Sequence, residues 1–177
     1  MSEDLRDKYK HLLADSPAPS TDDLVEANEI IEGSLAHELA KLMADVVSFY
    51  FRAHGAHWNV VSPNFTEWHA FFGEVAADVY DSLDPLAENI RKLGHFAPTR
   101  FGQFVVMREL DDGVDHSDGL MLARDLLDAN GIVINCINEA FHAAEMANEQ
   151  GTMDFLAGRD DMHKKWSWQL RSHLGMA

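Results

Sequence analysis

The chain has 177 residues, 46% of them hydrophobic, so it is long enough to fold as one domain around a substantial core. Its 30 Asp and Glu residues against 14 Lys and Arg give a formal net charge of -16, which disfavours nucleic acid and acidic membranes as partners and favours cations. The single cysteine, Cys136, excludes a disulfide within the chain and is typical of a reducing compartment.

The N-terminus shows no targeting signal. The segment MSEDLRDKYK is charged and no apolar stretch follows it, so it is not a signal peptide. No window approaches the roughly 18 consecutive apolar residues that a membrane-spanning helix needs. We therefore expect a cytoplasmic protein that does not enter a membrane.

A proline-containing break, SPAPST at residues 16–21, separates the beginning of the chain from the rest. We expect residues 1–21 to form an N-terminal extension and residues 22–177 to form the domain. Residues 22–31 are expected to be helical, because Ser and Thr residues just before them can cap a helix.

A strong helical pattern begins at Leu35. Apolar residues recur at alternating spacings of four and three, which places them on one stripe of a helix: Leu39, Met43, Val46, Tyr50, Ala53 and His57. The segment VVSPN at residues 60–64 is expected to end this helix, because the residue before Pro63 disfavours the helical conformation. His57 therefore lies at the far end of the stripe.

A second long helix is expected from about Thr66 to Leu93, followed by Gly94 as a stop. Its stripe consists of Trp68, Phe72, Val75, Val79, Leu86, Ile90 and Leu93. Pro85 lies inside this pattern and is expected to remove one backbone hydrogen bond and kink the helix there.

The next segment, residues 94–119, is a long connection. We expect a short helix at its apolar patch, residues 101–107, and an acidic loop after it. A third helix is expected from about Gly119 to Glu149 and a fourth from Met153 to Leu174. Between them Gly151 is expected to end the third helix and Thr152 to cap the fourth. The expected stripes are Leu120, Ala123, Leu127, Ile134, Ile137, Phe141 and Ala144, then Leu156, His163, Trp166 and Leu170.

Four long helices with one long connection predict an all-α fold. A long link between the second and third helices must cross the bundle, which favours a ferritin-like four-helix bundle over a simple up-and-down bundle.

Four side chains are suited to metal chemistry: His57, His69, Asp84 and Glu88. The two carboxylates are four residues apart on the second helix and so point to the same side. His69 precedes Asp84 by fifteen residues, which returns it to within about 60° of the same face. Imidazole and carboxylate ligands suit iron, zinc or manganese better than copper or an iron–sulfur cluster.

A single chain cannot bring all four ligands to one metal. His69 and Glu88 are 19 positions apart, which is about 28 Å along one helix. Two copies of the helix packed antiparallel across a twofold axis would place His57 and His69 of one subunit opposite the two carboxylates of the other. Such a contact creates two equivalent sites per dimer.

The segment HGAHWNVVSPN at residues 54–64, followed by His69 and by DSLDPLAENIRKLG at residues 81–94, closely resembles the signature of the Dps (DNA protection during starvation) mini-ferritin family. In that family a His in an HWN triplet, a second His twelve residues on and a D-x-x-x-E pair form the ferroxidase centre between two subunits. By resemblance, His57, His69, Asp84 and Glu88 are the catalytic metal ligands. The resemblance extends from about residue 22 to residue 174.

The resemblance implies a hollow dodecameric shell with metal sites at its twofold interfaces. Such a shell oxidises ferrous iron with hydrogen peroxide, or more slowly with oxygen, stores ferric mineral and protects against oxidative damage. Zinc is expected as a competitor for the iron sites. Two alternatives remain: a non-catalytic shell that binds zinc or a single iron, and a helical interaction protein whose acidic faces bind a basic partner.

One position departs from the family pattern. The family usually has an acidic residue four positions after the second His, whereas this chain has Gly73. Glu74 is rotated by about 140° from His69 and points away from it in a regular helix. Asp81, one turn before Asp84, is another possible substitute. The second metal position can therefore be weak, water-filled or served by a different residue.

Several other polar residues have competing interpretations. Asp154 matches the acidic residues that line iron-entry pores in the family, or is simply a carboxylate favoured near a helix N-terminus. Glu139 and His142 form an E-x-x-H pair that we interpret as a surface feature, and His163 as structural. His54 either supports the site or is merely exposed.

DNA binding is not expected, although many Dps proteins bind DNA through Lys-rich tails. The first ten residues carry balanced charges and the C-terminal RSHLGMA is nearly neutral. Counterion release needs several clustered cations, which this chain lacks. Its acidity is also compatible with nothing more than a solubilising surface.

Overall fold

The computed structural model of the protein describes residues 30–176. The chain divides into two units, Met1–Ile30 and Ile31–Ala177, and the described helices all belong to the second. The predicted extension at residues 1–21 and most of the predicted helix at residues 22–31 lie outside the described residues. Ile30 and Ile31 are described and are not helical.

The described part of the chain is helical, as predicted. Its elements are α3 (Leu35–Asn59), α4 (Phe65–Asp81), α5 (Leu83–Lys92), α6 (Phe101–Met107), α7 (Gly119–Met146) and α8 (Gln150–His173). Its one extended pairing is an isolated bridge between Val61 and Asp118. Among these helices, none combines the length and the apolar character of a membrane-spanning segment.

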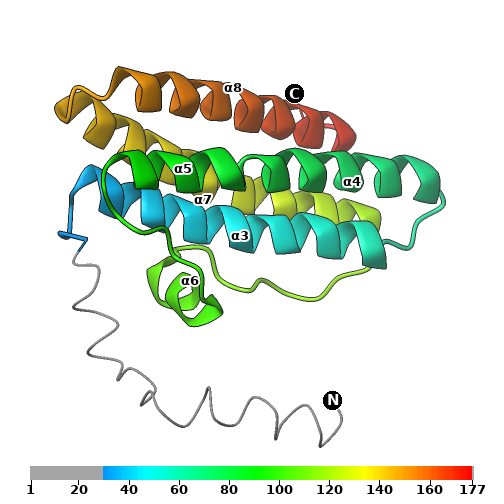
Figure 1. The fold of residues 1–177 in the computed structure, drawn as a ribbon. Helices are drawn as coiled ribbons and strands as arrows, with labels where there is room; N and C mark the ends of the chain where they lie inside the picture. The colour runs from blue at the N-terminus through cyan, green and yellow to red at the C-terminus, as the bar shows by residue number, and fades with distance from the viewer. Residues whose placement is uncertain (1–29, 177) are drawn as a thin grey trace, which may run out of the picture. The chain divides into compact units, whose positions relative to one another are not determined.

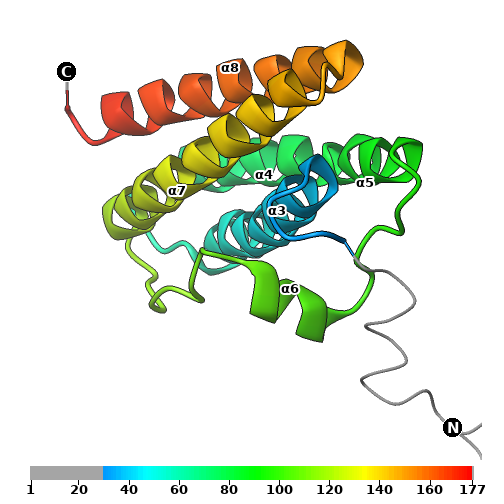
Figure 2. The same ribbon diagram turned by 90° about the vertical axis from the view of Figure 1, so that its left-hand side faces the viewer.

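The bundle consists of α3, the α4–α5 pair, α7 and α8. Helix α3 packs against α4, α5 and α7, and α7 packs against α8. Helices α4 and α5 follow each other end to end (Figure 1), and α6 lies on the side of α3 away from α8 (Figure 2). This is the predicted four-helix bundle with a short helix in its long connection.

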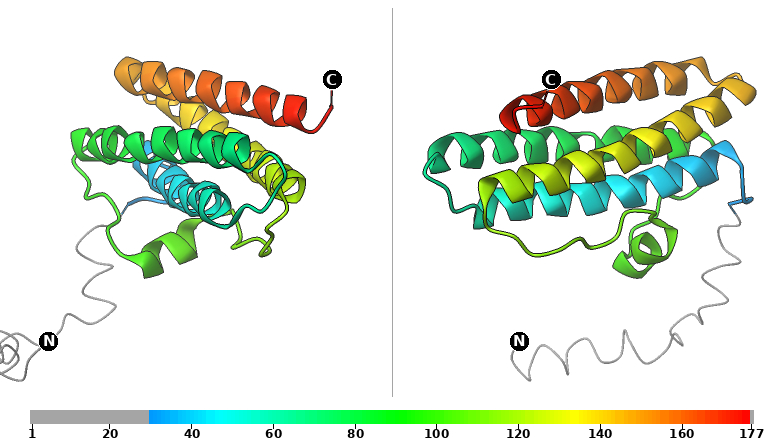
Figure 3. Two further views of the ribbon diagram at one scale, coloured as in Figure 1. Left: turned by 90° about the vertical axis from the view of Figure 1, so that its right-hand side faces the viewer. Right: turned by 180° about the vertical axis from the view of Figure 1, so that it is seen from behind.

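The connection between α5 and α7 crosses the length of the bundle (Figure 3, right). It returns to the C-terminal end of α3, where the Val61 N–H donates a hydrogen bond of 2.7 Å to the Ser117 carbonyl. Asp118 then caps α7 by accepting hydrogen bonds of 3.0 Å from the N–H groups of Leu120 and Met121. Helix α7 therefore runs parallel to α4, as the predicted crossover requires.

The second long helix is broken at Ser82 instead of merely kinked at Pro85 as predicted. Pro85 has no N–H for the Asp81 carbonyl, and its ring clashes with a carbonyl four residues earlier. The interruption therefore lies one turn before the proline. The Ser82 hydroxyl donates a 2.7 Å hydrogen bond to the Val79 carbonyl at the break.

The end of α7 also differs from the prediction. The helix stops at Met146, and the left-handed residue after it is Asn148, with φ of 56°, while Gly151 and Thr152 lie inside α8. The Asn148 N–H donates to the Glu145 carbonyl, and the next N–H donates to the Ala144 carbonyl. This is the Schellman pattern, in which Asn can replace Gly because it tolerates positive φ.

The buried face of α7 is shifted from the predicted stripe. Leu120 is exposed and Leu127, Ile134 and Phe141 are only half-buried. The helix contacts both α3 and α8, so its buried face is wider than one stripe. Its core positions are Leu122, Ala123, Leu126, Ala129, Asn130, Val133, Cys136, Ile137, Ala140 and Ala144.

The crossing connection is held to α3 by a buried carboxylate. Asp45 is fully buried, and its Oδ1 accepts hydrogen bonds from the N–H groups of Glu109 (2.9 Å) and Leu110 (2.7 Å). The Cys136 thiol donates to the other oxygen at 3.3 Å. Burial raises the pKa of Asp45 although these hydrogen bonds oppose the shift. The lone cysteine is thus a structural donor inside the bundle.

Candidate metal centre

The structure brings His57 and His69 together. His57 lies in the last turn of α3 and His69 in the second turn of α4, and the short loop between the helices allows their rings to stack. The ring centroids are 3.7 Å apart and the ring planes differ by 21°. Both side chains are half-buried, so they remain accessible from one side.

The two histidines hold each other through reciprocal hydrogen bonds. Nδ1 of His57 lies 2.6 Å from the His69 carbonyl oxygen, and Nδ1 of His69 lies 2.8 Å from the His57 carbonyl oxygen. A carbonyl oxygen only accepts, so both Nδ1 atoms must carry the hydrogen. In a neutral ring Nε2 then keeps the lone pair that a metal ion takes. This is the usual way in which a second hydrogen bond orients a ligating imidazole.

One of these bonds also satisfies a helix end. The His57 carbonyl is among the last four of α3, which have no partner within the helix. The N–H of Val61, four residues on, donates instead to Ser117. His69 therefore supplies the hydrogen bond that the end of α3 requires, and the same bond fixes the orientation of its own ring.

Gly73 makes room for the His57 ring. A Cβ atom added at Gly73 would lie 2.8 Å from Nδ1 and 3.1 Å from Cε1 of His57, and the first distance is shorter than real Cβ contacts allow. The glycine thus does more than omit a ligand. It allows the imidazole to pack directly against the backbone of α4 and to reach the His69 carbonyl.

The two predicted carboxylate ligands lie elsewhere on the chain. Asp84 and Glu88 are both exposed on α5, beyond the break at Ser82. The proposed substitutes Asp81 and Glu74 are exposed on α4. Within residues 30–176 no group of three or more His, Cys, Asp and Glu side chains is arranged to hold a metal ion. One chain therefore presents a histidine pair and, separately, a carboxylate pair.

Aromatic side chains extend from the histidine pair along α3. The His54 ring lies 5.6 Å from the His57 ring and 4.3 Å from the Trp58 ring, measured between centroids. Nδ1 of His54 is 2.8 Å from the hydroxyl of Tyr50, whose ring lies 5.4 Å from that of Tyr80. The sequence interpretation left His54 open and did not single out the tyrosines. The i,i+4 spacing of Tyr50 and His54 was the available signal.

The other polar residues singled out in the sequence, Glu139, His142 and Asp154, are exposed on the helix surfaces. Glu139 and His142 are exposed on α7, where they pair with Lys41 (3.3 Å) and Glu145 (3.4 Å) respectively. Asp154 is exposed on α8, which begins at Gln150, so Asp154 lies beyond the first turn, where a helix dipole favours a carboxylate most. Its pore role stays a prediction.

His163 is fully buried, and its Nδ1 lies 2.6 Å from Oδ1 of Asn130. Its Nε2 lies 3.4 Å from the Arg159 guanidinium. Burial, with help from the Arg159 charge, lowers the pKa of His163 to about 3, so the ring is neutral near pH 7. These contacts agree with a structural role.

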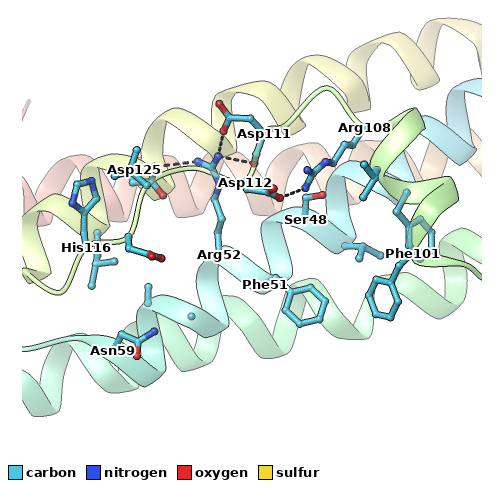
Figure 4. Close-up of a pocket in the computed structure, with 18 residues that line it drawn as sticks. Ser48, Phe51, Arg52, Asn59, Phe101, Arg108, Asp111, Asp112, His116 and Asp125 are labelled. Atoms are coloured by element: carbon cyan, nitrogen blue, oxygen red, sulfur yellow. Dashed lines mark hydrogen bonds and ion pairs between the residues drawn. The ribbon is translucent and has the colours of Figure 1, made fainter.

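A cavity of about 330 Å³ lies between α3, α6 and the connection to α7 (Figure 4). None of the four predicted ligands lines it. Arg52, which does, pairs with Asp111 and with Asp125, the latter at 3.0 Å. Phe51 and Phe101 occupy the apolar end of the cavity (Figure 4). The pair of Arg52 with Asp111 fastens the connection to α3.

Comparison with known proteins places the chain in a family. The model of the ferritin-like domain matches residues 36–176. An uncharacterized low temperature-induced protein of Nostoc sp. is 27% identical over 135 residues, which cover 75% of each chain. A DNA protection during starvation protein of Helicobacter pylori is 24% identical over 139 residues, or 77% of this chain and 95% of that one.

The fold is also similar to those of solved Dps structures. The Dps protein from Vibrio cholerae, described as a member of a broad superfamily of ferritin-like diiron-carboxylate proteins, superposes with a TM-score of 0.76 at 27% identity. The match covers 79% of this chain and 88% of the Vibrio chain. The chain thus belongs to the ferritin-like domain family and, within that superfamily, to the Dps proteins.

Proposed function

We propose that the protein is a mini-ferritin that binds ferrous iron between paired subunits, oxidises it with hydrogen peroxide or oxygen and stores the ferric product in a hollow shell. Iron is here the substrate. The observation that carries this proposal is the reciprocally hydrogen-bonded pair His57 and His69, whose Nε2 atoms are the nitrogens left for a metal.

Each half of the site has a separate task. The histidine pair supplies neutral nitrogen donors, which suit a ferrous ion. Asp84 and Glu88 of the partner subunit would supply two negative charges. These charges favour ferric over ferrous iron, because the attraction grows with the charge of the ion. The net charge of -16 per chain raises the local concentration of ferrous ions around the shell.

The proposed twofold contact has support on the surface of the bundle. Large apolar side chains are exposed on α3, α4, α6 and the segments beside them: Phe51, Trp58, Val61, Phe65, Tyr80, Phe101, Val105, Val106 and Val114. Exposed apolar surface of this extent is typical of a protein interface. A second copy that covers this surface would bring its own carboxylates to the histidine pair. A closed shell of twelve chains is the assembly that we propose.

The site can be tested by stopped-flow absorbance of ferric iron formation. The double variant His57→Ala and Asp84→Ala should oxidise ferrous iron much more slowly than the wild type, because each site loses a nitrogen and an oxygen ligand. The matched control, Glu139→Ala and His142→Ala, removes an exposed carboxylate and an exposed imidazole outside the site and should keep the wild-type rate. The mass of each assembly, from light scattering, confirms that the variants assemble alike. Equal rates in all three proteins would refute the assigned ligands.

A second candidate function is a metal-binding shell without rapid turnover, holding zinc or a single iron. Gly73 favours it, because no side chain can be added there while His57 keeps its place. Tight zinc binding together with slow ferrous oxidation would identify this alternative. In either case we expect a cytoplasmic homo-oligomer without DNA binding, since the N-terminal ten residues carry no excess of positive charge.

A further inference from the structure

We propose that Trp168 and the cations beside it dock on a groove at the start of α7 of a second copy of this chain. This contact rests on the proposed function, because the shell proposed there needs it. Twofold contacts alone join two chains and then stop, whereas a larger closed assembly also needs a contact between two different surfaces of the chain.

The first surface is the exposed face of the C-terminal half of α8. Trp168 is 59% exposed there. Lys164 and Lys165 precede it by four and three residues and Arg171 follows it by three, so these cations lie beside the indole on the helix surface. Residues 162–176 contain three Lys and Arg residues and no Asp or Glu. The indole is therefore an apolar contact surrounded by positive charge, in a chain with a net charge of -16.

Most of this positive charge is available to a partner. Lys164 is paired with Asp160 at 2.5 Å. Lys165 and Arg171 pair with no carboxylate within residues 30–176, and Nζ of Lys165 lies 5.5 Å from the centroid of the buried Trp166 ring. An acidic surface is the complement that these two cations lack.

The second surface is a groove of about 480 Å³ at the start of α7. Leu120 and Met121, which are 54% and 51% exposed, and the half-buried Leu174 form its apolar wall. Exposed apolar side chains in a hollow of this kind are typical of a contact with another protein surface. The groove thus offers an apolar contact for an indole.

The surroundings of the groove are acidic. Residues 111–128 contain six Asp and a single Arg, Arg124. Asp125 and Asp128 both line the groove. Asp125 is paired with Arg52, whereas Asp128 is exposed and forms no ion pair in the part of the chain that the structure describes. The groove therefore matches the α8 surface in charge as well as in apolar character, and such complementarity sets which surfaces meet.

The charges also determine the symmetry of the contact. Two α8 surfaces placed against each other would bring Lys165 and Arg171 of both chains together, and like charges repel. The contact is therefore head to tail, and it repeats from chain to chain until it closes into a ring. The two surfaces lie at the same end of the bundle, since Leu174 of the groove follows Trp168 by six residues (Figure 3, right). This proximity favours a small ring of three, and such rings joined by the twofold contacts form the closed shell.

Light scattering over a range of protein concentrations tests the contact. Trp168→Ser should reduce the assembly to twofold dimers, about one sixth of the mass of a shell of twelve. Lys165→Glu and Asp128→Lys should each shift dissociation to a protein concentration at least about 10-fold higher, because each places like charges across the contact. A chain that carries both reversals should assemble as the wild type does. The matched control is Glu145→Lys, which reverses an exposed charge on α7 outside the groove and should leave assembly unchanged.

The outcomes separate this contact from the iron site. Wild-type assembly by Trp168→Ser, or a double reversal that assembles no better than either single one, would overturn the contact. It would also be overturned if these variants assemble normally but lose a DNA duplex that the wild type retains at low salt, because the α8 surface would then serve nucleic acid. Dimers of Trp168→Ser keep the twofold contact and should bind ferrous iron anaerobically as the wild type does. A fully assembled wild type that neither binds nor oxidises ferrous iron would overturn the proposed function and leave the contact standing.

Discussion

Replacing Gly73 with aspartate, the type of residue that the Dps pattern has at this position, is expected to weaken iron binding rather than restore a second metal position. A Cβ atom at Gly73 would lie 2.8 Å from Nδ1 of His57. The imidazole must therefore move and lose its hydrogen bond to the His69 carbonyl, now 2.6 Å long. Loss of such an orienting bond costs about 10- to 100-fold in metal affinity.

Anaerobic titration with ferrous iron measures this effect. The matched control is Gly158→Asp on α8, because that glycine is exposed and a Cβ atom there meets no other atom within 4 Å. The control should bind iron as the wild type does. Gly73→Ala should already show most of the loss, since the clash comes from Cβ. Unchanged affinity in Gly73→Asp, or two ferrous ions bound per site, would show that His57 does not need this space.

The second large effect is expected on stability in acid. The pKa of His163 is about 3 in the folded chain and about 6.5 in the unfolded chain. Between these two values the unfolded chain binds one more proton than the folded chain does. The free energy of unfolding should therefore be fully retained above about pH 6.5 and should fall by up to about 1.4 kcal/mol for each pH unit below it.

Guanidinium denaturation at pH 7 and pH 5, at a fixed subunit concentration because the protein is expected to be oligomeric, measures this loss. His163→Gln removes the titrating group and keeps an N–H donor that can face Asn130, so the difference between the two pH values should shrink. His142→Gln alters an exposed histidine and should leave the difference as in the wild type. The comparison between variants also cancels the opposite contribution of Asp45, whose pKa is raised by burial. An equal difference in all three proteins would mean that His163 is not the group responsible.

The arrangement of the helices could be predicted from the sequence because it depends on local patterns. The start of α3 at Leu35, the short helix Phe101–Met107 and the start of α7 at Gly119 were all predicted and are confirmed. Apolar spacing, capping residues and the length of the connection are properties of the chain itself. They fix which segments are helical and that one link must cross the bundle.

The boundaries that were predicted wrongly depend on particular backbone contacts. Pro85 was expected to kink its helix at the proline itself, but the interruption falls one turn earlier, at Ser82, because Pro85 has no N–H to donate to the Asp81 carbonyl. Gly151 was a plausible stop by composition, whereas Asn148 adopts the left-handed conformation earlier and ends α7 first. The position of each helix boundary depends on hydrogen bonds that the sequence pattern does not specify.

The histidines of the candidate site were predicted from their spacing, but the hydrogen bonds that orient their rings were not. The contacts of each Nδ1 with the other residue's carbonyl depend on how α3 and α4 meet across their loop. Gly73 looked like a missing ligand in the sequence, and its role as space for His57 emerges only when the ring is placed. Asp45 was missed for the same reason, because the N–H groups that it accepts from are 64 and 65 residues away.

The central claim, that a histidine pair of one subunit works with a carboxylate pair of its neighbour, is tested most directly by mixing two inactive variants. One carries His57→Ala and His69→Ala, and the other carries Asp84→Ala and Glu88→Ala. A mixed dimer has one site with all four substitutions and one intact site, because each subunit contributes different ligands to the two sites. Unfolding and reassembling the two variants together in equal amounts should restore about a quarter of the wild-type sites and of the ferroxidase rate. Mixed shells as inactive as the two parent variants would contradict the claim.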